Sequence, residues 1–172
     1  MKERIYIYIS KISKVFEFIN YLISLLVFFG LFIVFIFRKS VTKSLYLMGG
    51  LLHINNYHGE VIPIEFVFIA CILAIVILFC IANIFKKISI IALNIGEKTC
   101  FEDTNLHHLV DIIKNLILII IIRIFGEAIF IYTQNGTIKE LLNIHFKYYI
   151  FNFILIIIAL FTYLILKKRK NM

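Results

Sequence analysis

Charged residues are scarce in this sequence of 172 residues, and their scarcity indicates the solvent in which the chain folds. Only 16% of the residues are charged, 62% are hydrophobic, and the mean hydropathy is +1.00. Soluble domains contain roughly 25% charged and roughly 45 to 50% apolar residues. A water-soluble fold could not bury this much apolar surface, so the composition excludes a soluble globular protein and predicts a protein embedded in a lipid bilayer.

Proline, glycine and cysteine are also rare. With one proline and seven glycines, the chain has no flexible linker, and we expect a single membrane domain over residues 1–172. Cys71 and Cys80 lie nine positions apart, on opposite faces of a helix, and Cys100 is alone in a loop, which excludes a disulfide framework or a paired-cysteine metal motif. Tryptophan is absent while Ile, Phe, Lys and Asn are abundant, a composition typical of an AT-rich bacterial genome.

Four long apolar stretches occupy about half of the chain. They cover residues 18–37, 63–85, 112–132 and 148–166. At about 1.5 Å of rise per residue, each stretch is long enough to cross a hydrocarbon core about 30 Å thick. The sequence therefore predicts an all-α polytopic membrane protein with four transmembrane helices.

The net charge of +8 comes from lysines and arginines at the ends of the apolar stretches, as in the tail 167–172. Because they form no continuous stripe, they indicate membrane orientation rather than direct binding of nucleic acid. With the N-terminus inside, twelve lysines and arginines fall on the inner side and five on the outer side. The positive-inside rule then predicts a plasma membrane protein with both termini in the cytoplasm.

Two segments outside the spans have patterns of their own. In residues 2–17, Ile5, Ile9, Ile12 and Phe16 recur at helical spacing among basic residues, which predicts an amphipathic helix on the anionic inner leaflet. The alternation of isoleucine and tyrosine over residues 5–9 leaves a short strand as an alternative. In the first outer loop, residues 45–52 are apolar but too short to span, and predict an interfacial or re-entrant turn.

The cytoplasmic loop 86–111 is the most distinctive segment. The second helix is expected to continue past its span until Gly96 ends it. The third helix is expected to begin in the cytoplasm, because Leu106, Leu109 and Ile113 follow a run of capping residues at helical spacing. The residues assigned to this loop and helix cap are Gly96, Phe101, Glu102, Asp103, Thr104, Asn105 and Leu109.

The segment from Gly96 to Leu109 resembles the bacterial membrane family catalogued as domain of unknown function 2975 (DUF2975), in which Gly-x-Pro-Phe-Thr-x-x-Asn and Leu-x-x-Ile precede a third span. This chain keeps Gly96, Phe101 and Asn105 but has Cys100 in place of the proline and Glu102 in place of the threonine. The resemblance implies a small four-helix membrane protein without established activity, often encoded beside a helix-turn-helix regulator of the Xre type.

Two ionisable residues fall inside the third span. Arg123 lies near its middle and Glu127 one helical turn later, and an arginine at such a depth costs roughly 2.5 to 3.5 kcal/mol on insertion scales. The spacing predicts an ion pair, either lining a cavity or clamping two helices together. Equal depth in the fourth span adds Asn152, so we expect an intramembrane polar cluster of Arg123, Glu127 and Asn152 in the outer half of the bundle.

Metal binding and catalysis find little support in the sequence. The ligand types near the third helix, Cys100, Glu102, His107, His108 and Asp111, match no zinc spacing, so we expect capping and solvated-face roles, with no metal and no cofactor. The motifs HExxH, GxSxG and the P-loop are absent. The sequence does not predict an enzyme.

Three functions agree with this sequence. The first is a regulatory or partner-docking subunit that binds a helix-turn-helix regulator or another membrane subunit through its cytoplasmic loop and tails. The second is a transporter or channel subunit that uses Arg123 and Glu127 and oligomerises to enclose a path. The third is an immunity-type protein that protects its host against a membrane-active peptide.

Overall fold

The structure is a computed structural model that describes residues 2–36, 64–97, 103–133 and 149–170. These residues form the helices α1 (Lys2–Ile36), α3 (Ile64–Gly96), α4 (Asp103–Thr133) and α6 (Ile150–Lys170). The described part of the chain is therefore helical throughout, as predicted. Within it, three segments, on α1, α3 and α6, are long and apolar enough to cross a membrane: Arg4–Ile33, Val67–Gly96 and Ile150–Lys168.

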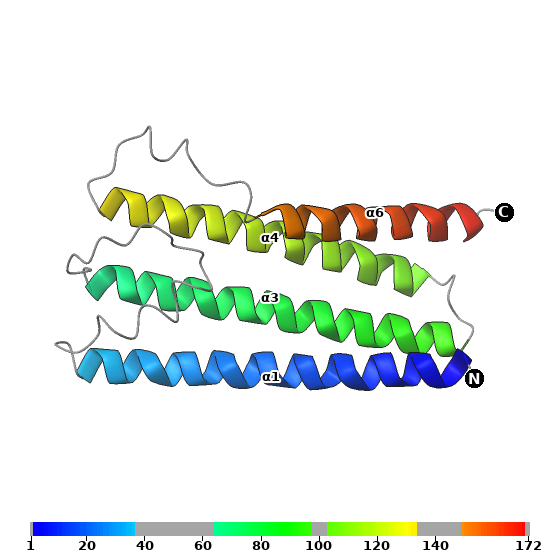
Figure 1. The fold of residues 1–172 in the computed structure, drawn as a ribbon, viewed down its shortest axis with the longest axis horizontal. Coiled ribbons are helices and arrows are strands. Elements are labelled where there is room, and N and C mark those ends of the chain that lie inside the picture. Colours follow the sequence, from blue (N-terminus) through cyan, green and yellow to red (C-terminus); the bar gives the residue numbers. More distant parts are fainter. Residues whose placement is uncertain (1, 37–63, 98–102, 134–148, 171–172) are drawn as a thin grey trace.

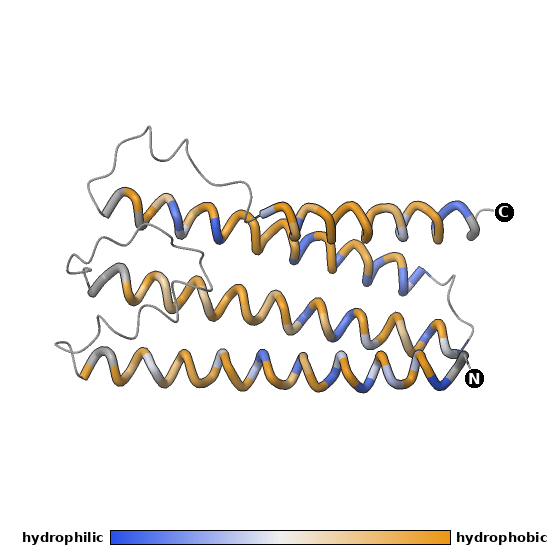
Figure 2. The backbone as a smooth tube through the Cα atoms, in the orientation of Figure 1, coloured by the Kyte–Doolittle hydropathy of each residue, from blue (hydrophilic) through white to orange (hydrophobic). Residues whose placement is uncertain are grey.

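The helices lie side by side in the order α1, α3, α4, α6, and each runs antiparallel to its neighbour (Figure 1). Each helix packs mainly against the next one in sequence, so the arrangement is an open row. The start of α1 and the end of α6 lie at the same end of this row, which we call the terminal end. Figure 2 shows that hydrophilic residues gather toward the terminal end.

Residues 2–36 form one continuous helix, so the amphipathic segment 2–17 and residues 18–36 of the predicted first span are parts of a single element. The alternative of a strand at residues 5–9 is wrong. With 35 residues, α1 is about 52 Å long. Its first half lies along α3, where Phe16 stacks on Phe85 with ring centroids 5.1 Å apart. These contacts with α3 explain why the basic first half continues the axis of the apolar second half.

Helix α3 supplies more buried residues than any other described helix because it lies between α1 and α4. Small side chains let its neighbours approach closely; Ala70, Ala74 and Ala82 are at most 1% exposed. One core cluster joins Val67 and Ile77 of α3 to Ile119 of α4. The helix continues beyond residue 85 to Gly96, as the sequence predicted.

Helices α4 and α6 meet in a second core cluster, formed by Leu109, Ile112 and Leu116. Leu155 and Leu166 of α6 pack against this cluster, as do isoleucines of α3. Helix α4 runs unbroken from Asp103 to Thr133, as predicted for a third helix that begins before its span. Helix α6 continues through Lys170, four residues beyond the predicted end of the fourth span.

The helices at the two edges of the row, α1 and α6, expose large apolar side chains. Phe18 and Leu26 of α1 are 66% and 62% exposed, and Phe151 and Phe161 of α6 are 68% and 65% exposed. Apolar surface on this scale is unusual for a protein surrounded by water, and it agrees with a lipid-facing role for both helices. The apolar segment 45–52 of the first outer loop lies outside the described residues.

Candidate functional site

The residues of the predicted intramembrane cluster lie where α4 and α6 meet. Arg123 and Glu127 are in the second half of α4, the half farther from the terminal end, and Asn152 is in the first turn of α6. Figure 1 shows that α6 begins beside α4 at some distance from the terminal end. Glu127 of α4 accepts a 2.7 Å hydrogen bond from the hydroxyl of Tyr149, the residue that precedes α6. Among the described residues, Arg123 and Glu127 form no ion pair within 4.0 Å. Glu127 therefore connects α4 to α6 rather than neutralising the arginine on its own helix.

Arg123 and Asn152 both line a cavity of about 370 Å³ between α3, α4 and α6. Asn152 is 8% exposed, and its amide Nδ2 is buried without a hydrogen-bond partner, as is Nε of Arg123. The structure thus brings two of the three predicted side chains, Arg123 and Asn152, to one cavity, and the third, Glu127, is bonded to Tyr149 instead.

Tyr149 is a residue whose role the sequence did not reveal. Tyr149 is 1% exposed and donates its hydroxyl hydrogen to Glu127. A tyrosine buried in an apolar setting requires a partner for its hydroxyl. The signal in the sequence was an acidic residue in the third span that needed a donor from another helix.

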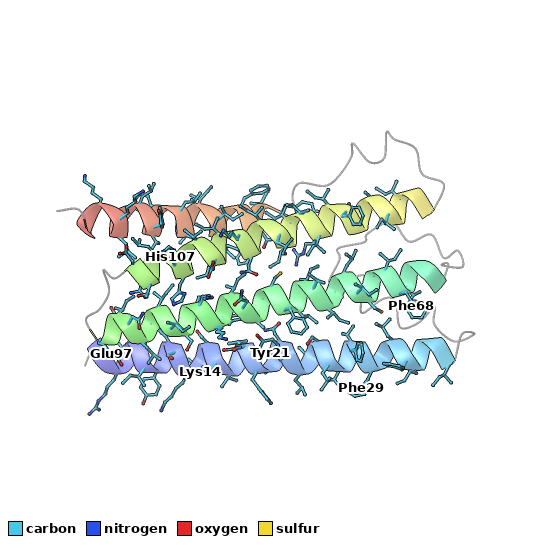
Figure 3. All side chains as sticks on the ribbon, turned by 180° about the vertical axis from the view of Figure 1, so that it is seen from behind. Lys14, Tyr21, Phe29, Phe68, Glu97 and His107 are labelled. Carbon is cyan, nitrogen blue, oxygen red and sulfur yellow. The ribbon has the colours of Figure 1, made fainter. Side chains whose placement is uncertain are left out.

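A second group of polar contacts holds the helices together at the terminal end. Ser10 of α1 and Ser89 of α3 share a 2.7 Å hydrogen bond, with exposures of 2% and 1%. Gly96 at the end of α3 lies against Tyr6, where an added Cβ would stand 3.5 Å from the tyrosine Cβ. Figure 3 shows Glu97 beside the first residues of α1, at the end opposite to Phe29 and Phe68.

Lys87 of α3 links to two residues of α4. Its Nζ lies 3.0 Å from Oδ2 of Asp111 and 3.4 Å from Nδ1 of His108. An ammonium group can only donate, so Nδ1 of His108 accepts and the ring is neutral with its proton on Nε2. Burial, and then the charge of Lys87, lower the pKa of His108 from 6.5. The hydrogen bond from Lys87 lowers the pKa of Asp111 from 3.8.

Asn105 has a structural role in addition to the predicted position in the helix cap. It is fully buried, and its side-chain oxygen accepts a 2.7 Å hydrogen bond from Nδ2 of Asn94. Asp103 and Thr104 lie in the first turn of α4, and Leu109 belongs to the second core cluster. Gly96 is the last residue of α3. Phe101 and Glu102 lie outside the described residues.

The residues considered as metal ligands form no such site in the described ranges, which contain no group of three or more His, Cys, Asp or Glu side chains able to hold a metal ion. Asp111 is instead paired with Lys87. Cys100 and Glu102 lie outside the described residues.

Comparison with protein-family models finds no match for this chain, and comparisons with curated proteins and with solved structures find none either. Two groups of contacts in the described residues bear on function, one where α4 meets the start of α6 and one at the terminal end. The resemblance to DUF2975 stays a prediction.

Proposed function

We propose that this chain is a non-catalytic plasma membrane protein that docks a partner protein at the terminal end of its helix row. The proposal includes four membrane spans, with α4 as the third. What supports this number is the position of α4 between α3 and α6, which are both long and apolar enough to cross a membrane. A helix packed between two spans is expected to share their environment.

The same proposal places the terminal end in the cytoplasm. Eight basic residues of the four helices support this orientation under the positive-inside rule, because each lies in the half of its helix nearest the terminal end; Arg123 of α4 is the exception. They are Arg4, Lys11, Lys14, Lys86, Lys87, Lys114, Lys167 and Lys168. A reporter that is active only in the cytoplasm, fused after Lys170, should be active; an extracytoplasmic signal would contradict the orientation.

The observation that carries the docking function is the length of α1 and α3. In this proposal both helices extend beyond the membrane at the terminal end, and we call this extension the projection. Helices α1 and α3 have 35 and 33 residues, so they exceed a hydrocarbon core about 30 Å thick by about 20 Å. Side-chain bonds join this projection across three helices: Ser10 to Ser89, Asn94 to Asn105, and Lys87 to Asp111. Such bonds give the projection a fixed shape that a partner can recognise.

The surface of this projection on α1 is both apolar and basic. Ile5, Tyr8 and Ile12 are 54%, 65% and 55% exposed, and Arg4 and Lys11 are exposed among them. This composition favours a partner with acidic side chains around an apolar patch. A regulator or a second membrane subunit could supply such a surface, and the family resemblance favours the regulator.

Site-specific photo-crosslinking in cells tests this proposal. A photoreactive amino acid at Tyr8 should give a protein adduct, and the charge reversal Lys11→Glu should reduce its yield several-fold. The matched control is Phe29, which is 55% exposed on the same helix but lies far from the terminal end; there we expect lipid adducts only. Absence of a protein adduct at Tyr8, or an equal adduct at Phe29, would contradict the proposal.

A transporter or channel subunit is the second candidate, favoured by one observation: the cavity lined by Arg123 and Asn152. An ionisable side chain within a span usually faces protein or water rather than lipid. Reconstituted protein should then carry a flux of anions that Arg123→Ala abolishes, and a flux unaffected by that change would count against this candidate.

A further inference from the structure

The cavity beside Arg123 has the composition of a ligand site. Helix α4 forms one wall and α3 and α6 form the others. Its volume of about 370 Å³ falls within the range of small-molecule pockets, roughly 300 to 1,000 Å³. Apart from Arg123 and Asn152, all its lining residues are apolar, with Ile84 and Phe85 on α3, Leu116 on α4 and Leu155 on α6 among them.

The two polar lining residues present donors. Asn152 is more than nine-tenths buried, and its Nδ2 has no partner; Nε of Arg123 is likewise buried without one. The nearest carboxylate along α4, that of Glu127, accepts from Tyr149 and does not line the cavity. A buried donor without an acceptor is destabilising, and Arg123 and Asn152 are the two lining residues that carry such a donor.

We propose that this cavity binds an acyl-chain molecule with one anionic oxygen group, and that a long-chain carboxylate is the form that fits best. The guanidinium of Arg123 and the amide of Asn152 bind the carboxylate, as arginine commonly does. The acyl chain of the ligand follows the apolar walls of the cavity toward Leu116 and Phe85. A single chain suits the volume better than a two-chain lipid. The proposal goes beyond partner docking and does not depend on it.

Photo-crosslinking with purified protein in nonionic detergent tests the site. A photoreactive fatty acid should label peptides of α3, α4 or α6 near the cavity, and palmitate should displace it. Hexadecanol, which has the chain without the charge, and acetate, which has the charge without the chain, should each compete at least about tenfold more weakly, because charge-assisted hydrogen bonds and apolar burial both contribute. If phosphatidylglycerol competes as well as palmitate, the same site takes its anionic group from phospholipid.

Two variants and one control identify the residues. Arg123→Gln should weaken palmitate competition by roughly 10- to 100-fold, the loss expected for hydrogen bonds to a charged group. Asn152→Asp keeps the arginine and places a carboxylate in the cavity, so it should abolish binding even if Arg123→Gln fails to fold. Lys114→Gln removes an exposed charge from the same helix outside the cavity and should leave binding unchanged.

Three results would overturn the inference. Equal competition by hexadecanol and palmitate would show that the anionic group is not recognised. Equal competition by acetate and palmitate would show that the acyl chain is not recognised. Labelling unchanged in Asn152→Asp would place the ligand elsewhere. Crosslinking of the cavity to an acidic side chain of another membrane helix, with no displacement by palmitate, would assign the cavity to a protein partner instead. None of these results bears on docking at Tyr8.

Discussion

The bond between Asn94 and Asn105 gives the sharpest test of how the terminal end is held together. Asn105 is fully buried at the start of α4 and accepts a 2.7 Å hydrogen bond from α3. The change Asn105→Ala removes the acceptor and leaves the amide of Asn94 without this bond. The loss of a buried hydrogen bond costs about 1 to 3 kcal/mol, and the better helix propensity of alanine offsets about 0.5 kcal/mol of this.

We therefore expect Asn105→Ala to lower the free energy of unfolding by about 0.5 to 2.5 kcal/mol. For a chain of this size, 1 kcal/mol corresponds to a shift in Tm of about 2 to 4 °C, so the expected decrease in Tm is about 1 to 10 °C. Thermal unfolding in detergent, followed by circular dichroism, measures it. Asn94→Ala should be partly non-additive with Asn105→Ala, with a coupling energy of at least about 0.5 kcal/mol.

Asn115 on the same helix supplies the matched control. Its amide donates to the carbonyl oxygen of Asp111 within α4, so its bond is local and joins no second helix. Asn115→Ala should leave Tm unchanged or raise it by up to about 2 °C, because the better helix propensity of alanine offsets the loss of this local bond. If Asn105→Ala and Asn115→Ala unfold at the same temperature, or if the double variant is fully additive, the contact between α3 and α4 does not stabilise the terminal end and the argument fails.

The remaining predictions concern three other contacts. Ser10→Ala should lower the unfolding free energy by about 1 kcal/mol, and adding Ser89→Ala should restore part of it in the same thermal assay. Tyr149→Phe should lower Tm more than Glu127→Gln, because glutamine keeps an oxygen that can accept. For His108, the folded pKa lies below 6.5, so its contribution to stability is present above pH 6.5 and is lost as pH falls through the folded pKa; His108→Gln should flatten Tm between about pH 7 and 5. A steeper profile in that variant would be inconsistent with the neutral ring.

The fold was largely predictable because its signals are local. Helical length, apolar content and the start of α4 depend on residues close in sequence, and the structure confirms the continuation of α3 to Gly96 and the early start of α4. The continuity of α1 was harder to predict, because its basic first half looks like a separate amphipathic helix. Its straight path depends on contacts with α3, such as Phe16 on Phe85, which no local pattern reveals.

The candidate sites depended on partners far apart in sequence. The residues that need a partner could be predicted: Arg123 and Glu127 are polar groups in an apolar stretch. Their partners could not, since the spacing on one helix indicated an ion pair while the structure pairs Glu127 with Tyr149. Likewise, the sequence predicted a solvated or metal-ligating role for Asp111. In the structure, Nζ of Lys87 on α3 lies 3.0 Å from Oδ2 of Asp111.

The sequence alone determined that this chain is helical, apolar beyond what water tolerates, and basic near the ends of its apolar stretches, because composition and periodicity act through each residue and its near neighbours. Only the tertiary structure decided that the helices form an open row, that Tyr149 rather than Arg123 satisfies Glu127, and that Arg123 and Asn152 meet in one cavity. Those facts depend on the register between helices, which is set by how side chains pack across their interfaces.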